Sequence, residues 1–374
     1  MLVNKINDTN EMKIFHVIDS LGSGGAERFV VDLANELSLD SKFSITIVTI
    51  VDDKIPLKSH YLQELGNKVN YICLRATKGL SCKALYKVFS LIRKAKPDVV
   101  HAHCGLLQLL LPILFFRGIH FVHTLHNVAE KQIIFPFLKR PFRYLYQKYV
   151  TPVTISRVCD LSYQEFYGLK NSRCIYNGRS LMQTSCNFTH VKEEIDSYKV
   201  NANTIVFLHV ARFGEAKNQK MLVDAFERLA LTSANFVLLI IGARHEKASY
   251  YGKINSSRIR ILGEKNNVVD YLACSDFFVL TSLWEGLPIS LLEAMAVGCV
   301  PVCTPAGGIP DILKHGYNGF LANGFGCEEF YHLLCSVVGI DNYEQIKRNA
   351  KDFFAQNLTM KICAKKYVSV YENV

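Results

Sequence analysis

The sequence has no long apolar run. None of its segments reaches the roughly 18 consecutive apolar residues that span a bilayer. The longest candidate, residues 106–116, is broken by Gln108 and Pro112 and predicts a buried helix instead. The first dozen residues, MLVNKINDTNEM, lack the apolar core of a signal peptide. We therefore expect a protein that stays in the cytoplasm.

Prolines and closely paired cysteines are also scarce. Ten prolines and a hydrophobic content of 49% exclude a disordered or fibrous chain. The 12 cysteines form no C-x-x-C pair, and most have apolar neighbours, as Cys73 does after Tyr71 and Ile72. Such cysteines behave as small buried hydrophobes, so we expect no metal site. The 374 residues suffice for two domains, at roughly 100 to 200 residues each.

Short β-rich runs alternate with longer helical patterns along the whole chain, which predicts two doubly wound α/β domains. The predicted strands of the first half are 14–18, 45–50, 98–102 and 121–124, with helices at 27–37 and 83–94. The second half repeats the scheme with strands at 205–210, 236–241, 259–262, 277–281 and 300–303. The boundary is expected in the polar stretch between Asn177 and Asn203. In such folds ligands bind at the carboxyl ends of the strands, so the site is expected on strand-to-helix loops.

The net positive charge of the chain comes entirely from the N-terminal half. Residues 1–180 hold 24 basic and 14 acidic side chains, whereas residues 181–374 hold 19 of each. This asymmetry predicts that the N-terminal half meets an anionic partner. The segment 131–150 is basic and aromatic and contains no acidic residue. It fits an anionic membrane surface or, equally, a core-packed helix with basic flanks. Nothing resembles a nucleic-acid-reading module, so we expect no nucleic-acid partner.

Three loops carry residues suited to a phosphorylated sugar. The glycines Gly22, Gly24 and Gly25 open a predicted helix, whose N-terminus favours a phosphate, although a glycine-rich turn without a ligand fits equally well. The spacing is not G-x-G-x-x-G, so a nicotinamide cofactor is not supported. Arg212 and Lys217 follow the first strand of the second half and can neutralise a pyrophosphate; a pair of solvated cations is the alternative.

The strongest pattern runs from Trp284 to Gly298, WEGLPISLLEAMAVG. Glu285 and Gly286 lie on a loop, Pro288 suits the first turn of the next helix, and Glu293 lies within that helix. Helix-start amides can bind a diphosphate, while the two carboxylates accept hydrogen bonds from sugar hydroxyls. Two glutamates eight residues apart are common on solvated helices. Here Glu293 stands among Leu, Ala and Met, where an unpaired carboxylate is costly.

With these motifs in place, the sequence resembles the family-4 retaining nucleotide-sugar glycosyltransferases of GT-B fold, of the bacterial surface-polysaccharide type. The resemblance covers most of the chain and rests on the following segments: Gly22 to Glu27, Val100 to His103, Thr124 to Asn127, Tyr176 to Gly178, Arg212 with Lys217-Asn218, Glu285 to Ala296, and Pro305 to Asp311. It implies two Rossmann-like domains that face each other across a cleft. Residues 1–180 would form the acceptor domain, 181–355 the donor domain, and 356–374 a helix that packs back on the N-terminal domain.

The resemblance also implies roles for single residues. Glu285 would hold hydroxyls of the donor sugar, Glu293 the ribose, and the backbone amides around Leu287 to Ser290 the diphosphate. The donor-binding segment would thus include Gly286, Leu287, Pro288 and Ile289. Backbone around Gly263 to Lys265 would hold the base, and Gly24 and Gly25 would lie near the phosphate and the acceptor. Arg212 and Lys217 would stabilise the departing nucleoside diphosphate in place of a metal. His126 would lie beside the reacting sugar, although a histidine buried and satisfied by backbone is the alternative.

Two segments depart from the family pattern. Arg179 and Ser180 stand where an acidic residue is common after Asn177-Gly178, and Gly242 to Glu246 replaces a common Gly-Asp-Gly loop.

The function implied by the resemblance is retaining transfer of a hexose-type sugar from a UDP- or GDP-linked donor. The acceptor would be a lipid-linked or other saccharide in lipopolysaccharide, O-antigen or capsule synthesis, on the inner face of the cytoplasmic membrane. No cofactor or metal is expected. The alternatives are a nucleotide-sugar hydrolase or epimerase, a phosphorylase, or a non-catalytic saccharide-binding relative.

Overall fold

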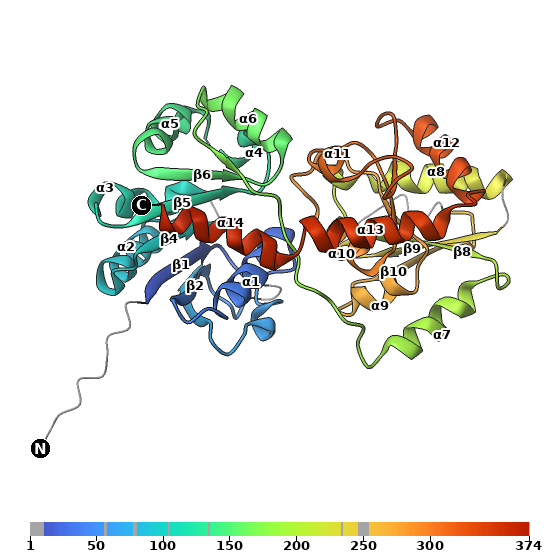
Figure 1. Cartoon of the computed structure of the whole chain (residues 1–374), viewed down its shortest axis with the longest axis horizontal. Helices are drawn as coiled ribbons and strands as arrows, with labels where there is room; N and C mark the ends of the chain where they lie inside the picture. The colour runs from blue at the N-terminus through green and yellow to red at the C-terminus, as the bar shows by residue number, and fades with distance from the viewer. Residues whose placement is uncertain are drawn as a thin grey trace, which may run out of the picture. The chain divides into compact units, whose positions relative to one another are not determined.

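The computed structural model describes residues 11–55, 58–77, 81–103, 105–133, 135–232, 235–245 and 254–373. The chain divides into two compact units (Figure 1). Met1–Gly178 and Met360–Val374 form the first unit, and Arg179–Thr359 form the second. Most of the segment on which the signal-peptide expectation rests, residues 1–10, lies outside the described residues.

The first unit is built on a parallel sheet with the strand order β3-β2-β1-β4-β5-β6-β7. Its strands are β1 (Met12–Ile18), β2 (Phe43–Val51), β3 (Asn70–Ala76), β4 (Val99–Ala102), β5 (His120–Leu125), β6 (Val150–Thr154) and β7 (Arg173–Cys174). Its helices are α1 (Gly25–Leu37), α2 (Cys82–Ala95), α3 (Leu110–Phe115), α4 (Ala129–Gln132), α5 (Lys139–Lys148), α6 (Arg157–Tyr167) and α14 (Met360–Glu372). Short 3-10 turns are η1 (Leu62–Glu64), η2 (Leu106–Leu109) and η3 (Pro136–Leu138).

Alternate residues of these strands face opposite sides of the sheet, and each side is covered by helices. Phe15, Val17 and Phe121 belong to an apolar cluster with residues of α2, α3, α5 and α6. His16, His101 and Thr124 alternate with them and lie with Tyr367 and Tyr371 of α14 on the other side. The last helix thus completes the core of the first unit, and Figure 1 shows it in red alongside these strands.

The second unit repeats the architecture with the strand order β10-β9-β8-β11-β12-β13, again all parallel. Its strands are β8 (Ile205–Val210), β9 (Phe236–Ile241), β10 (Ile259–Gly263), β11 (Phe277–Leu280), β12 (Val300–Cys303) and β13 (Phe320–Leu321). Its helices are α7 (Phe188–Tyr198), η4 (Glu215–Lys217), α8 (Gln219–Thr232), α9 (Val268–Ala273), α10 (Ile289–Val297), α11 (Ile309–Ile312), α12 (Cys327–Val338) and α13 (Tyr343–Asn357). A fully apolar strand such as Phe236–Ile241 is buried at all six positions, as expected of a sheet covered on both faces.

The doubly wound α/β architecture predicted from the sequence is confirmed, and every predicted strand is present within one or two residues. The strands β3, β6, β7 and β13 were not predicted. Helix α7 was not predicted either, and it lies inside the stretch taken as a polar boundary. Helix α7 is mostly polar but buries Val191 and Ile195, one turn apart. The expectation of a buried helix over 106–116 is wrong in part, because Leu114 and Phe115 are exposed and the segment begins as a 3-10 turn.

Candidate active site

In both sheets the strand order reverses beside the first strand of the unit. The reversal lies between β1 and β4 in the first unit and between β8 and β11 in the second. Ligands of doubly wound sheets bind beyond the carboxyl ends of the strands at this point, because the following loops diverge there. The residues singled out from the sequence follow these same strands: Gly24 and Gly25 after β1, and Lys217 and Glu285 after β8 and β11.

In the second unit, Lys217 and Glu285 form an ion pair through Nζ and Oε1. The same carboxylate oxygen accepts a hydrogen bond from the Ser282 hydroxyl at 2.6 Å. The side chains of Lys217 and Glu285 are 26% and 11% exposed. The two residues predicted from separate motifs are therefore brought together, and a cation and a carboxylate are held at the edge of solvent. Arg212 lies on the same loop as Lys217, after β8, and its side chain is exposed.

Backbone contacts fix the loop that carries Glu285. The Leu283 amide donates to the Ala216 carbonyl at 2.8 Å, and the Thr281 hydroxyl donates to the Lys217 carbonyl at 3.0 Å. On the other side, Gly307 adopts φ +55°, and a side chain there would meet the Glu285 carbonyl oxygen 2.0 Å from its Cβ. The next amide, of Gly308, donates to the Gly286 carbonyl at 2.8 Å. Only glycine at 307 permits this close approach of the two loops.

Helix α10 begins directly after this loop, with Pro288 as its N-cap. The sequence predicted Pro288 in the first turn of this helix, but it lies one residue before that turn. The first amides of a helix have no acceptor within the helix, and the helix dipole makes this end positive. Leu287, Pro288 and Ile289 are buried, which holds the start of the helix in place. The arrangement suits a phosphate, as the sequence predicts.

Glu293, one turn further along α10, is paired with Arg179. The Arg179 Nε lies 2.9 Å from the Glu293 Oε1, and the two side chains are only 10% and 14% exposed. Arg179 begins the second unit, and its amide donates to the Leu358 carbonyl. The residue noted as a departure from the family pattern is thus the counter-ion of Glu293. This ion pair explains why the Glu293 carboxylate is tolerated among apolar neighbours.

The neighbouring loops of the second unit are linked by further backbone bonds. The Gly242 amide donates to the Gly263 carbonyl at 2.9 Å, and the Phe213 amide to the Ala243 carbonyl at 2.9 Å. The Lys265 ammonium lies 3.6 Å from a Glu194 carboxylate oxygen on α7. Glu194 also accepts from the Tyr271 hydroxyl, and this hydrogen bond helps to lower its pKa against the effect of burial. The Lys265 side chain is therefore engaged with α7. Residue 246 of the unusual loop lies outside the described residues.

In the first unit, Gly24 is the N-cap of α1 and Gly25 its first residue. The carboxylate of Glu27 lies against Gly24, since a Cβ at Gly24 would stand 2.1 Å from Glu27 Oε2. A carboxylate in the first turn already complements the positive end of this helix. A phosphate bound here would meet the Glu27 carboxylate.

His126 directly follows β5 and is half-buried. Its Nε2 lies 3.2 Å from Nδ1 of His103, so this nitrogen contacts another histidine. Burial lowers the pKa of His126 to about 3, which keeps the ring neutral in the physiological range.

His16, His101 and His103 form a buried cluster, in which one ring nitrogen of each residue lies within 4.8 Å of those of the other two. Three histidines can hold a transition metal. Both ring nitrogens of His101 are engaged, however, since Nδ1 lies 2.7 Å from the Tyr371 hydroxyl and Nε2 2.7 Å from the Thr124 hydroxyl. The ring of His101 is thus fixed by the protein itself.

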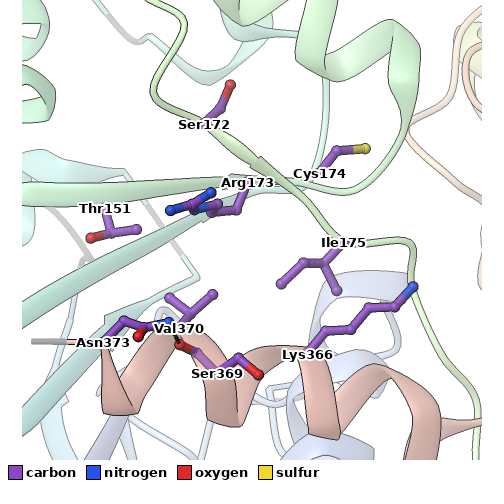
Figure 2. Close-up of a pocket in the computed structure, with 9 residues that line it drawn as sticks. All are labelled: Thr151, Ser172, Arg173, Cys174, Ile175, Lys366, Ser369, Val370 and Asn373. Carbon is purple, nitrogen blue, oxygen red and sulfur yellow. Dashed lines mark hydrogen bonds between the residues drawn. The ribbon is translucent and has the colours of Figure 1, made fainter.

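A pocket of about 540 Å³ lies elsewhere in the first unit (Figure 2). It is lined by residues of β6, the β7 region and α14, among them Thr151, Arg173 and Lys366. No residue predicted from the sequence as part of the site is among its nine lining residues. Its two cations are exposed side chains.

Both units resemble known glycosyltransferase sequences. Residues 23–181 match the model "Glycosyltransferase Family 4", and residues 191–352 match "Glycosyl transferases group 1". The chain is 28% identical over 321 residues to the UDP-Gal:α-D-GlcNAc-diphosphoundecaprenol α-1,3-galactosyltransferase of Escherichia coli, covering 81% of this chain and 80% of that protein. It is 25% identical to the capsular polysaccharide biosynthesis glycosyltransferase CapH of Staphylococcus aureus, covering 78% of this chain and 81% of that one.

Among solved structures, Anabaena HepE in complex with UDP and glucose superposes with a TM-score of 0.80 at 19% identity, covering 97% of this chain and all of that one. The fold is therefore that of the GT-B glycosyltransferases. The chain belongs to the family 4, group 1 glycosyltransferases, and it is an enzyme of that class.

Sequence reasoning missed three parts of this arrangement. Ser282 and Gly307 contact Glu285 but lie outside the glutamate motif, although the Gly307-Gly308 pair signals a backbone constraint. Arg179 was noted only as a departure. An arginine that interrupts a family pattern, together with a glutamate in an apolar helix, is the signal that could have joined the two.

Proposed function

We propose that this enzyme moves a hexose-type sugar, with retention of anomeric configuration, from a UDP- or GDP-linked donor to a lipid-linked saccharide. The product would be an intermediate of lipopolysaccharide, O-antigen or capsule synthesis. The similarity to the E. coli galactosyltransferase, named for a UDP-linked donor and a lipid-linked acceptor, supports the donor and acceptor classes. The similarity to CapH supports a role in capsule-type polysaccharide synthesis. The HepE structure holds UDP and glucose, which supports a uridine donor in the same fold.

One observation carries the proposal: a cation, a carboxylate and a helix N-terminus meet at the strand-order reversal of the second unit. Lys217 and Glu285 pair there, and α10 begins four residues after Glu285. A sugar attached to a diphosphate needs these three elements together. The helix start and the cation take the phosphates, and the carboxylate takes the sugar hydroxyls. Glu293, oriented by Arg179, would bind the ribose hydroxyls with its second oxygen.

The reaction breaks the bond between the anomeric carbon and the β-phosphate oxygen. The acceptor hydroxyl forms its bond to that carbon on the same face, and its proton passes to the departing phosphate oxygen. Negative charge grows on the diphosphate as the bond breaks, so Lys217 and Arg212 stabilise the transition state more than the bound substrate. In this proposal the two cations do the work that a metal does in other transferases.

The residues of the first unit would serve the acceptor and the reacting sugar. His126 would donate a hydrogen bond from its ring N–H to a sugar hydroxyl or to developing charge. Its lowered pKa leaves the neutral ring with one such N–H. Gly24 and Gly25 would approach the acceptor through their backbone.

The basic segment 131–150 would contact the anionic membrane in which a lipid-linked acceptor resides. Helix α5 buries Phe142, Leu145 and Tyr146, so the core-packed alternative holds for that face. Phe135, Phe137 and Tyr144 remain 41%, 74% and 51% exposed. Aromatic residues beside lysines and arginines favour the interface of an anionic bilayer. No described helix has the length and apolarity needed to cross a membrane.

The test is transfer by the purified full chain. It is incubated with a panel of UDP- and GDP-sugars, with and without undecaprenyl-diphosphate-linked N-acetylhexosamine, and the product is analysed by mass and by anomeric configuration. We expect one donor to give a product one hexose larger with the donor's anomeric configuration. Nucleotide release that does not depend on acceptor would identify a hydrolase, and an inverted product would refute retention. The same reaction in EDTA is expected to proceed unchanged.

A further inference from the structure

Three histidines lie in a row across neighbouring strands of the first sheet. His16 is in β1, His103 directly follows β4, and His126 directly follows β5. Nδ1 of His16 lies 3.0 Å from Nε2 of His103, and Nδ1 of His103 lies 3.2 Å from Nε2 of His126. We call these residues the histidine row. Each contact joins two ring nitrogens, so each needs one N–H and one bare nitrogen.

All three rings of the histidine row are neutral. Burial lowers the pKa of His16 and His126 to about 3, and it lowers the pKa of His103 well below the usual value. Each ring therefore carries one proton, and the three protons have to serve two hydrogen bonds. Because His103 has a single proton, only two arrangements satisfy both contacts.

In the first arrangement the protons point toward His126. His16 donates from Nδ1 to His103, His103 donates from Nδ1 to His126, and the proton of His126 is left on Nδ1. In the second arrangement every proton is on Nε2, so His126 donates to His103 and its own Nδ1 is bare. The two arrangements present opposite chemistry at His126: a hydrogen-bond donor in the first and an acceptor in the second.

His16, at the end of the histidine row away from His126, distinguishes the two proton arrangements. Nε2 of His16 is buried and has no hydrogen-bond partner among the described residues. In the second arrangement this atom would be a buried N–H without an acceptor. In the first it is a bare nitrogen, and buried N–H groups without partners are rarer in proteins than buried acceptors without donors. The first arrangement is therefore favoured.

We propose that His103, backed by His16, holds His126 in the tautomer with its proton on Nδ1, so that His126 faces the reacting sugar as a hydrogen-bond donor. His103 and His16 are positioning residues that act through His126. The inference rests on the proposed function for what His126 does, but not for which nitrogen carries the proton. Packing supports the row, since the rings of His101 and His103 have centroids 3.9 Å apart and Phe29 meets His126 edge-on at 5.5 Å.

The direct test is ¹⁵N NMR of the full chain labelled at histidine, without donor, near pH 7. A ring nitrogen with a proton and one without differ widely in ¹⁵N shift, and the signals are assigned by substitution of single histidines. We expect His126 and His103 to carry their protons on Nδ1 and His16 to have a bare Nε2. A proton on Nε2 of His126 would overturn the inference. This readout does not need activity, so it can fail or succeed separately from the proposed function.

Kinetics of three variants at His103 test its positioning role. His103→Leu removes the donor to His126 and is expected to lower kcat about ten- to a hundredfold with little change in the donor KM. His103→Asn places an amide near the position of Nδ1 and should recover part of kcat, whereas His103→Gln places it near Nε2 and should not. A role in packing alone would favour Gln, which is closer to His in size.

His123→Phe is the control. His123 is buried on β5 and hydrogen-bonded to the Tyr146 hydroxyl, outside the histidine row. We expect this variant to keep both the His126 tautomer and kcat while it loses some stability. Equal kcat in His103→Leu and the wild type would refute the positioning role even if the tautomer is as proposed.

Discussion

Removal of the Arg179 charge leaves the Glu293 carboxylate without its cation, and this should lower the free energy of unfolding of the second unit. In Arg179→Met the stem is kept, but the Glu293 carboxylate, 14% exposed and surrounded on α10 by buried Leu292, Ala294 and Met295, loses its cation. Loss of one member of a fully buried pair costs about 3–5 kcal/mol. Because both side chains retain some exposure, we expect the second unit to lose about 2–3 kcal/mol of its free energy of unfolding.

The double variant Arg179→Met/Glu293→Met gives the diagnostic comparison. With both charges gone no carboxylate is left unpaired, and the stability is expected to return to within about 1 kcal/mol of the wild type. Arg179→Met and Glu293→Met should therefore be coupled by about 2 kcal/mol. The matched control is Lys220→Met, which breaks the exposed Lys220–Asp224 pair on α8 and should leave the unfolding midpoint unchanged.

Urea unfolding followed by tryptophan fluorescence measures these changes. Trp284 is the single tryptophan of the chain and lies in the second unit, one residue before Glu285. Its signal therefore reports the unit that holds the Arg179–Glu293 pair. A coupling energy below about 0.5 kcal/mol, the range expected of independent sites, would refute the assignment of Arg179 as the counter-ion.

Three further predictions follow from the geometry. Lys217→Met should lower kcat for transfer about 10²- to 10³-fold, while the exposed Lys220→Met stays near the wild type; a small effect at Lys217 would remove its electrostatic role. Gly307→Ala should weaken nucleotide binding and unfold the second unit earlier, because its Cβ meets the Glu285 carbonyl. Gly316→Ala, also at positive φ but in open space, should cost only about 1 kcal/mol and leave binding intact; equal effects would contradict the packing argument. Acid should unfold the first unit before the second, as seen by tyrosine fluorescence and circular dichroism. The cluster of His16, His101 and His103 stays neutral in the folded unit but binds protons below about pH 6.5 in the unfolded chain. The free energy of unfolding therefore decreases by about 1.4 kcal/mol for each histidine with every unit by which the pH is lowered below that value. A first unit that is stable at pH 4.5 would contradict this.

Much of the fold was predictable from the sequence because its strands are local and apolar. Ile205–Val210 and Phe236–Ile241 are continuous β-rich runs, and both have the predicted bounds. In contrast, β3 holds polar and half-buried residues and β6 contains Pro152, so neither has a clear periodicity. The helix α7 is stabilised by two buried contacts that only the folded unit supplies.

The sequence was sufficient to choose the residues of the candidate site, but it did not show which of them form ion pairs with one another. The glutamate motif and Lys217 could be found because local sequence places them on strand-to-helix loops. That Lys217 meets Glu285, and Arg179 meets Glu293, depends on contacts between residues 68 and 114 positions apart. The histidine row shows the same limit. Each histidine was visible in the sequence, but which nitrogen faces which depends on the parallel register of β1, β4 and β5.

Donor-dependent fluorescence of Trp284, with transfer assayed in the same samples, tests whether the second unit holds the nucleotide-sugar donor. UDP- and GDP-sugars are titrated into the wild type and into Glu293→Ala. We expect one nucleotide sugar to change the Trp284 signal of the wild type saturably and to be the donor consumed in transfer. The variant is expected to bind this sugar at least tenfold more weakly. Equal binding in the two proteins, or transfer that is unaffected by the variant, would contradict the assignment of the donor site to the second unit.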